Sequence, residues 1–342
     1  MFKILSLDGG GSRGAFIVGA LSELEKQTNS HITDYFDLIA GTSTGGVIGI
    51  LIALGYPMSV IEEIYSNKFP IIFTKNPRYF SGIYRFITFL TDPFVELFMN
   101  IKTEELIKSK YASSGVIEVL YDLVKNKNLS DITLSRLIIT ATNLKDGSAK
   151  TFKSYHLPDR PKSEDIALSR VLASTAAAPT FFEPVRINNH GVYCDGGLWA
   201  NHPGLAAYAE AVEIINECHR SVDPTFQRNF ISMLSLGTGF AVQNYIPPKN
   251  NSGFKWWANK LLPLMFESQS QSTGFYLDKL MLNRYLRLNF EIPNREWGKL
   301  DDYSNTKEMI ALGKITMQKN IDQVLKMFAK EKTEPFVPFD PV

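Results

Sequence analysis

The chain of 342 residues has little cysteine and almost no net charge. Its two cysteines, Cys194 and Cys218, are too few for the disulfide framework of a small secreted domain. Lys and Arg total 36 against 35 Asp and Glu, so the net charge of +1 predicts no broad basic surface that could neutralise nucleic-acid phosphates. The composition therefore disfavours a disulfide scaffold, and no nucleic-acid polymer is expected as a partner.

The sequence also lacks a convincing membrane span. No charged residue occurs from Leu38 to Ile61, a stretch long enough to cross a bilayer. Its continuous apolar part runs only from about Val47 to Leu54, and Pro57 interrupts it, so a buried core helix is expected there. The chain starts with the strand-like residues 2–7 in place of the charged and apolar regions of a secretory leader. These features predict a cytoplasmic protein.

Strand and helix patterns alternate along the chain. Apolar runs typical of strands occur at 2–7, 35–40, 136–142 and 229–236. Stretches with helical periodicity occur near 14–27, 45–55 and 203–218. This alternation favours a mostly parallel central sheet with helices on both faces, the α/β class in a three-layer sandwich. Ligands of such sheets bind beyond the carboxyl ends of the strands.

The length is compatible with one elaborated core. We expect a core over 1–240 and a mostly helical extension over 241–342, closed by an amphipathic helix from Asn305 with a capping box. Residues 69–99 carry nine aromatic side chains and are expected to form a lid or insertion. A second aromatic cluster over 255–266 mixes lysine with tryptophan, as segments at membrane interfaces do. The alternative is that both clusters pack on the core.

Two glycine-rich turns each follow a strand pattern. The first, DGGGSRG over 8–14, presents consecutive backbone N–H groups at the start of a helix, where unpaired donors and the helix dipole favour negative charge. The second, GTSTGG over 41–46, contains Gly-x-Ser-x-Gly, a sharp strand-to-helix turn that exposes the hydroxyl of Ser43. The pair predicts a nucleophilic serine beside an anion-binding loop. The alternative is that Ser43 caps the following helix.

A nucleophilic serine needs a base. Of the five histidines, only His190 and His202 lie near other candidate residues, and neither lies in a motif that would orient an imidazole toward Ser43. Asp195, at the end of a strand pattern and before two glycines, is the stronger candidate. Burial raises the pKa of a carboxyl group and makes it a better base. The alternative role for Asp195 is an Asx-turn.

Four motifs in this order resemble the patatin-like phospholipases: DGGGxRG at 8–14, GxSxG at 41–45, ASxAA at 173–177 with Pro179 close behind, and DGG at 195–197. The resemblance implies a patatin-like, modified α/β-hydrolase fold. It also implies an enzyme that cleaves fatty-acyl esters of lipids without a metal or cofactor. It also implies a catalytic dyad without histidine, formed by Ser43 and Asp195. The oxyanion hole would be formed by Gly9, Gly10, Gly11 and Thr44. Arg13 and Gly14 would support this loop.

Two other interpretations stay open. Family members commonly carry Asn-Asn-Pro after the DGG motif, whereas this chain has His202 at the second position, so a Ser–Asp–His esterase is an alternative. The glycines of residues 9–14 also match the dinucleotide-binding fingerprint, with Asp34 or Asp37 as the ribose-binding acid. A non-catalytic lipid-binding or storage protein is a third.

The resemblance further implies partners. We expect a phospholipid or other acyl-lipid substrate, and transient contact with a membrane surface during catalysis. Because cytosolic bacterial members include anti-phage effectors that cyclic nucleotides switch on, a cyclic-nucleotide activator is also expected. The sequence leaves the oligomeric state open.

Overall fold

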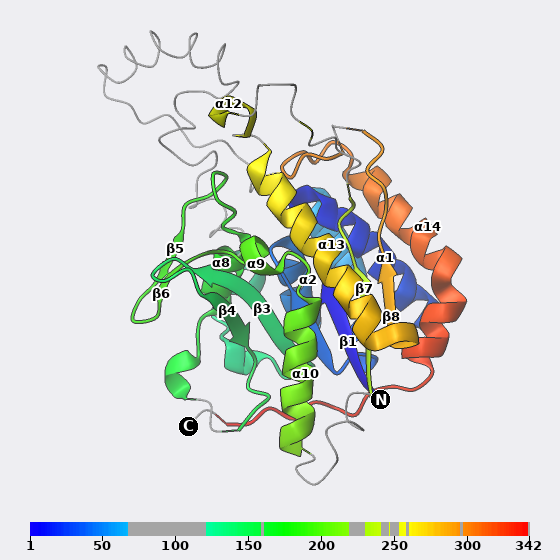
Figure 1. Ribbon diagram of the computed structural model, residues 1–342. Helices are drawn as coiled ribbons and strands as arrows, with labels where there is room; N and C mark the ends of the chain where they lie inside the picture. The colour runs from blue at the N-terminus through cyan, green and yellow to red at the C-terminus, as the bar shows by residue number, and fades with distance from the viewer. Residues whose placement is uncertain are drawn as a thin grey trace.

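The computed structural model describes residues 1–67, 121–158, 161–218, 230–240, 246, 253–257, 260–294 and 297–340. In this part of the chain, an eight-stranded sheet forms the middle layer, and helices cover both of its faces (Figure 1). The α/β class predicted from the sequence is confirmed. The aromatic segment over 69–99, expected to be a lid, lies outside the described residues.

The sheet has the order β5-β6-β3-β2-β1-β7-β8, and β4 also pairs with β3. The five strands from β3 to β8 in this order run parallel, whereas β4 and β6 pair antiparallel with β3, and β5 pairs antiparallel with β6. The strands are β1 (Phe2–Leu7), β2 (Leu38–Gly41), β3 (Arg136–Asn143), β4 (Ala149–Lys153), β5 (Val185–Ile187), β6 (Gly191–Asp195), β7 (Ile231–Leu236) and β8 (Tyr285–Leu288).

Alternating side chains of the strands feed two hydrophobic layers. Leu5 of β1 belongs to the larger layer, and Ile4 next to it belongs to the layer on the opposite face. The larger layer is covered by α1 (Gly14–Thr28), α2 (Thr44–Ala53), α3 (Met58–Asn67), α8 (Leu168–Ala176) and α14 (Thr306–Val324). The opposite face, toward the viewer in Figure 1, is covered by α10 (Gly204–Cys218) and α13 (Leu261–Met281). The short helices α9 (Gly197–Ala200) and α12 (Phe254–Trp257) lie before them in the chain.

Helix α2 is buried along its whole length, as expected for a core helix. Across the described ranges, no helix combines the length and apolar character needed to cross a membrane.

The closing helix α14 begins after Asn305, as the sequence predicts, but the predicted capping box is wrong. The Asn305 side chain makes no cap hydrogen bond, and its Nδ2 donates to Ser304 Oγ at 3.1 Å. The reason is the backbone of Asn305, whose φ of −102° and ψ of 19° depart from the extended conformation that directs a cap side chain to the helix N–H groups.

Strand β8 comes from the stretch expected to be an extension, yet it pairs with β7 in the central sheet. Helix α14, from the same stretch, packs closely on α1. A Cβ atom on Gly19 would overlap the carbonyl of Ile310, and one on Gly313 would overlap the carbonyl of Phe16. The division of the chain at residue 240 stays a prediction, but residues beyond it are needed to complete the sheet.

Candidate active site

Ser43 occupies a strained turn between β2 and α2. Its φ of 53° and ψ of −123° fall where residues with a side chain are uncommon. Gly41 and Gly45 allow the tight path, because a Cβ atom on either would overlap a backbone carbonyl. The Ser43 side chain makes no cap hydrogen bond to α2, so the capping interpretation is not supported. This is the geometry of the strand-to-helix nucleophile turn.

The turn is fixed by threonines from other elements. The N–H of Ser43 donates to Thr175 Oγ1 of α8 at 2.8 Å. Thr42 Oγ1 donates to the carbonyl of Ala200 at 2.5 Å and lies 2.7 Å from Thr140 Oγ1 of β3. Sequence reasoning assigned no role to Thr175, although the residue lies inside the ASTAA motif at 173–177.

Asp195, the last residue of β6, is buried beside this turn. Its Oδ1 accepts the N–H of Gly197 at 2.7 Å, and its backbone carbonyl accepts the hydroxyl of Thr142 at 2.9 Å. Burial raises the pKa of Asp195 to about 7, and hydrogen bonds from Gly197 and from the Ser43 hydroxyl lower it in part. Among the described residues, Oδ2 has no partner at normal hydrogen-bond geometry, so the Ser43 contact is a loose one. The structure thus brings the predicted serine and acid together.

The first glycine turn lies directly against the nucleophile. A Cβ atom on Gly9 would lie 3.3 Å from Ser43 Cβ. The N–H of Gly9 already donates to the carbonyl of Asn201 at 2.9 Å, so Gly9 offers no free donor. Its carbonyl accepts the hydroxyl of Thr238 at 2.6 Å. These two bonds clamp the loop at the position nearest Ser43.

The rest of the loop keeps free donors. Within the described part of the chain, no hydrogen bond uses the N–H groups of Gly10, Gly11 or Thr44. Nε of Arg13 donates to the carbonyl of Gly10 at 3.3 Å, as expected for a residue that braces the loop. Any side chain on Gly14 would overlap Thr44, so this glycine lets the first turns of α1 and α2 meet.

His202 is buried near the loop but faces other partners. Its Nε2 lies 2.9 Å from the Tyr285 hydroxyl and 3.1 Å from Ser235 Oγ, and its Nδ1 accepts the N–H of Gly204 at 3.1 Å. Nδ1 is also 3.5 Å from Oδ1 of Asp8. Burial, and secondarily the nearby Arg287, hold the pKa of His202 well below its ordinary value. The imidazole is therefore neutral, and its hydrogen-bond partners belong to β7, β8 and α10. It makes no described contact with Ser43.

A serine–histidine–acid array that does not include Ser43 lies near the amino end of β3. Ser154 Oγ lies 2.9 Å from Nδ1 of His156, whose Nε2 is 2.8 Å from Oε1 of Glu210. Ser154 Oγ also accepts the N–H of Leu137 at 2.9 Å, and all three side chains are buried. This array ties the segment that follows β4 to α10. In the described ranges, no group of three or more His, Cys, Asp or Glu side chains is placed to hold a metal ion.

The dinucleotide-binding interpretation places its acid at the wrong end of the sheet. Asp37 precedes β2 and its Oδ2 accepts the N–H of Lys3 at 2.7 Å, at the amino ends of the parallel strands. The glycine turn follows Leu7 at the carboxyl end of β1. Asp34 lies at the same far edge and pairs with Lys332 at 2.8 Å. Neither carboxylate can bind a ribose held by the glycine turn.

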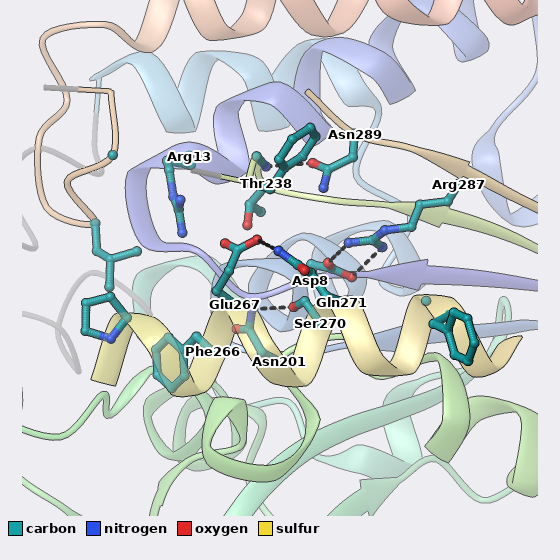
Figure 2. Close-up of a pocket in the computed structure, with 17 residues that line it drawn as sticks. Asp8, Arg13, Asn201, Thr238, Phe266, Glu267, Ser270, Gln271, Arg287 and Asn289 are labelled. Atoms are coloured by element: carbon teal, nitrogen blue, oxygen red, sulfur yellow. Dashed lines mark hydrogen bonds and ion pairs between the residues drawn. The ribbon is translucent and has the colours of Figure 1, made fainter. Parts of the chain in front are cut away.

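A cavity of about 580 Å³ opens beside the turn, between the strand ends and α13 (Figure 2). The ring of Phe266, which lines the cavity, lies close to Asp195. A Cβ atom on Gly197 would lie 3.0 Å from that ring and 3.1 Å from Oδ1 of Asp195. The lining combines polar with apolar side chains, among them Asp8, Arg13, Asn201, Thr238, Glu267, Ser270, Gln271, Arg287 and Asn289 with Phe240, Pro263, Phe266, Phe275 and Leu300.

Comparison with known proteins gives a family match. The model of the patatin-like phospholipase family matches residues 5–208. A cGAMP-activated phospholipase of Escherichia coli is 28% identical over 358 residues, covering 98% of this chain and 94% of that protein. Another, from Pseudomonas aeruginosa, is 27% identical over 293 residues, covering 84% and 78%.

Further similarities extend to a plant protein and to a solved structure. Patatin-like protein 2 of Arabidopsis thaliana is 32% identical over 262 residues, covering 70% of this chain and 60% of its own length. The crystal structure of VipD from Legionella pneumophila superposes with a TM-score of 0.43 at 12% identity, covering 91% of this chain and 66% of that one.

Proposed function

Since this chain belongs to the patatin-like phospholipase family, we propose that it works as a lipid acyl hydrolase through Ser43 as nucleophile and Asp195 as base. One observation carries the assignment of the dyad. A strained serine lies beside a buried carboxyl group whose pKa is about 7, close to the working pH that a general base requires. No imidazole is needed for this pairing.

In the first half of the reaction, Asp195 accepts the Ser43 proton while Oγ attacks the ester carbonyl of the lipid. The tetrahedral oxyanion receives hydrogen bonds from the unused N–H groups of Gly10, Gly11 and Thr44. Removing one donor of this kind lowers kcat by about a hundred- to a thousandfold in comparable sites. The intermediate collapses, the carbon–oxygen ester bond breaks, and the leaving alcohol takes the proton from Asp195.

In the second half, water hydrolyses the acyl-enzyme. Asp195 accepts a proton from the water as its oxygen attacks the acyl carbonyl, and the same donors stabilise the second oxyanion. Collapse returns the proton to Ser43 and releases the fatty acid. The enzyme is then restored without a metal or cofactor step.

The dyad is tested by Ser43→Ala and Asp195→Asn, which should each abolish fatty-acid release from phospholipid vesicles while the thermal melting temperature shows a folded protein. A fluorophosphonate should label the wild type and not Ser43→Ala, which separates an enzyme from a storage protein. His202→Gln is the matched comparison. Near-normal turnover by Asp195→Asn together with loss in His202→Gln would establish the Ser–Asp–His alternative instead.

We also propose that the enzyme is cytoplasmic and contacts the membrane peripherally through the outward face of α13. Large apolar side chains on this helix are exposed, among them Leu261, Met265, Phe275, Tyr276 and Leu280. Lysines accompany the aromatics, with Lys260 over Trp256 and Lys279 over Phe275. Apolar surface edged by lysine favours the interface of a bilayer, and Phe275 also lines the cavity.

Membrane contact predicts a difference between substrate forms. Tyr276→Ser combined with Leu280→Ser should weaken co-sedimentation with phospholipid vesicles and slow their hydrolysis, because exposed apolar area is lost from α13 at positions that do not line the cavity. Hydrolysis of a soluble short-chain ester should stay near the wild-type rate. Equal loss on both substrates would contradict the assignment.

A regulatory partner is proposed from the relatives. Two of them are named cGAMP-activated phospholipases and match most of this chain. We propose that a cyclic oligonucleotide activates this enzyme too, as part of an antiviral response that degrades membrane lipid. Vesicle hydrolysis should rise when one member of a panel of cyclic di- and trinucleotides is added. A rate unchanged by the whole panel would contradict this regulation.

A further inference from the structure

A small cavity lies away from the active site, between the start of α8 and the hairpin formed by β5 and β6. This hairpin forms one edge of the central sheet, at the left of Figure 1 with α8 beside it. The volume of the cavity is about 240 Å³. Sites for drug-sized ligands measure roughly 300–1,000 Å³, so this cavity suits one small chemical group and not a whole lipid.

Two arginines line this cavity. Arg170 lies in the first turn of α8 and Arg186 lies on β5, and both residues are exposed. In the described ranges, neither guanidinium group makes a hydrogen bond, an ion pair or a ring contact. A guanidinium group offers a planar fork of N–H donors that matches the oxygens of a phosphate. Two such groups from different elements, both without partners, favour an anion in the cavity.

The acidic residue of the wall does not neutralise these arginines. In the described lining, Asp165 carries the one carboxylate. Its Oδ1 accepts the N–H of Ser130 at 2.9 Å, and its Oδ2 accepts the Ser130 hydroxyl at 2.8 Å and Nδ2 of Asn128 at 3.3 Å. Neutral donors therefore hold the carboxylate, and two arginines against one aspartate leave the wall positively charged. His190, in the turn of the hairpin, adds an imidazole that no described interaction uses.

Two elements lead from this cavity to the active site. Helix α8 begins at the cavity, and its Thr175 accepts the N–H of Ser43 at 2.8 Å. Strand β6 follows the hairpin turn and ends at Asp195, whose N–H donates to the carbonyl of Ala177, directly after α8, at 3.0 Å. A ligand held between α8 and the hairpin would therefore join the two elements that position the dyad.

We propose that this cavity binds a phosphate group of an effector, with Arg170 and Arg186 donating to its oxygens and His190 as a third contact. The phosphate can belong to a soluble compound or to a lipid headgroup, since both present the same oxygens. Binding fastens α8 to the hairpin and so steadies the positions of Thr175 and Asp195. Binding at this site does not depend on the proposed hydrolysis, whereas its effect on the dyad does.

Thermal melting with inorganic phosphate as the probe tests the site. At equal ionic strength, phosphate should raise the melting temperature of the wild type above its value in chloride, because a ligand that binds only the folded state stabilises it. The double variant Arg170→Gln, Arg186→Gln should need about tenfold or more phosphate for the same rise, since two charge-assisted contacts are lost. Both residues are exposed, so this arginine variant should fold.

Lys307→Gln combined with Lys319→Gln is the matched control. It removes the same charge from exposed positions of α14 that do not line the cavity. Its response to phosphate should equal that of the wild type. A response that is the same in the wild type, the arginine variant and the lysine control, or absent from all three, would overturn the site.

Two further experiments identify the source of the phosphate. For a soluble source, calorimetry should show binding of one member of the cyclic-nucleotide panel, weakened about tenfold or more in the arginine variant. For a lipid source, phosphatidic acid added to phosphatidylcholine vesicles should strengthen co-sedimentation of the wild type more than that of the arginine variant. A melting response without either result would assign the site to free phosphate.

The effect on the dyad is measured by the rate at which a fluorophosphonate labels Ser43. Saturating phosphate should raise this rate about fivefold or more in the wild type and leave it unchanged in the arginine variant. Unchanged labelling in a wild type that binds phosphate would overturn the coupling to the dyad. Ser43→Ala should keep the melting response, so a failure of the proposed hydrolysis would leave the phosphate site standing.

Discussion

At the scale of single residues, Asp195 should set the pH dependence of the reaction. The carboxyl group must be ionised to accept the Ser43 proton, and burial raises its pKa to about 7. We expect kcat/KM for a soluble ester to rise about tenfold per pH unit below this value and to level off above it. A profile that is flat from pH 5 to 8 would exclude Asp195 as the base.

The same raised pKa predicts how stability changes with pH. Between the ordinary carboxyl pKa of 3.8 and about 7, the folded protein holds a proton that the unfolded chain has released, so the free energy of unfolding falls as pH rises. Asp195→Asn removes this dependence. At pH 8 we expect the free energy of unfolding of the variant, measured by urea unfolding, to exceed that of the wild type by up to about 4 kcal/mol. At pH 4 the two free energies of unfolding should differ little. An equal difference at both pH values would contradict burial as the cause.

Thr175 should act as a positioning residue for the nucleophile. Thr175→Val keeps the shape but leaves the N–H of Ser43 without its acceptor, at a cost of about 1–3 kcal/mol to the strained turn. We expect kcat and the rate of fluorophosphonate labelling to fall about tenfold or more, with KM little changed. Thr175→Ser restores the hydroxyl and should recover most of the rate. A Ser variant as slow as the Val variant would indicate a packing role only.

At the scale of elements, the ion pair between Arg287 and Asp8 joins β8 to the end of β1. Arg287→Met leaves the buried Asp8 carboxylate without a counter-charge and should lower the free energy of unfolding by about 3–5 kcal/mol. The double variant with Asp8→Asn should lose less than the single one, because no buried charge remains unpaired.

Urea unfolding of the single and double variants measures this coupling. The exposed pair Asp278–Lys279, with both side chains 66% exposed, provides the control. Its double-mutant cycle should give no more than about 1 kcal/mol. If the Asp8–Arg287 cycle gave a similarly small value, the pair would not hold the glycine turn to the sheet.

At the scale of the whole molecule, the C-terminal segment is fastened across the edge of the sheet opposite the active site. Nζ of Lys3 in β1 donates to the carbonyls of Phe328 at 3.1 Å and Glu331 at 2.5 Å. Further along, the N–H of Thr333 donates to the carbonyl of Asp34 at 2.7 Å, and that of Phe339 to Tyr155 at 2.8 Å. In Figure 1 this segment runs below the sheet, past the start of β1.

Lys3→Met should loosen this segment without slowing catalysis. Two carbonyls lose a charged donor, so we expect a loss of about 1–3 kcal/mol in stability. Amide hydrogen exchange over residues 328–340 should become faster. Hydrolysis of a soluble ester at 25 °C should stay near the wild-type rate, because the glycine turns lie at the carboxyl ends of the strands. A fall in activity without faster exchange would contradict this separation.

Much of the fold could be predicted from local sequence. The strands β1, β2, β3 and β7 and the helices α1, α2 and α10 lie within a few residues of their expected positions, since apolar periodicity and glycine turns report burial and turn geometry directly. The strand pattern that ends at Asp195 corresponds to β6, whereas the short strands β4, β5 and β8 were not identified. Their partners lie far away in sequence, so pairing and not local pattern decides that they form strands.

What the sequence determined by itself is the chemistry of the site. Glycines around Ser43 permit a sharp turn, and the glycines after Asp8 present consecutive backbone N–H groups at the start of a helix. The tertiary structure alone decided that Asp195 is buried beside Ser43 while His202 is held by Tyr285 and Ser235. A carboxyl pKa and the partners of an imidazole depend on surroundings that only long-range packing assembles.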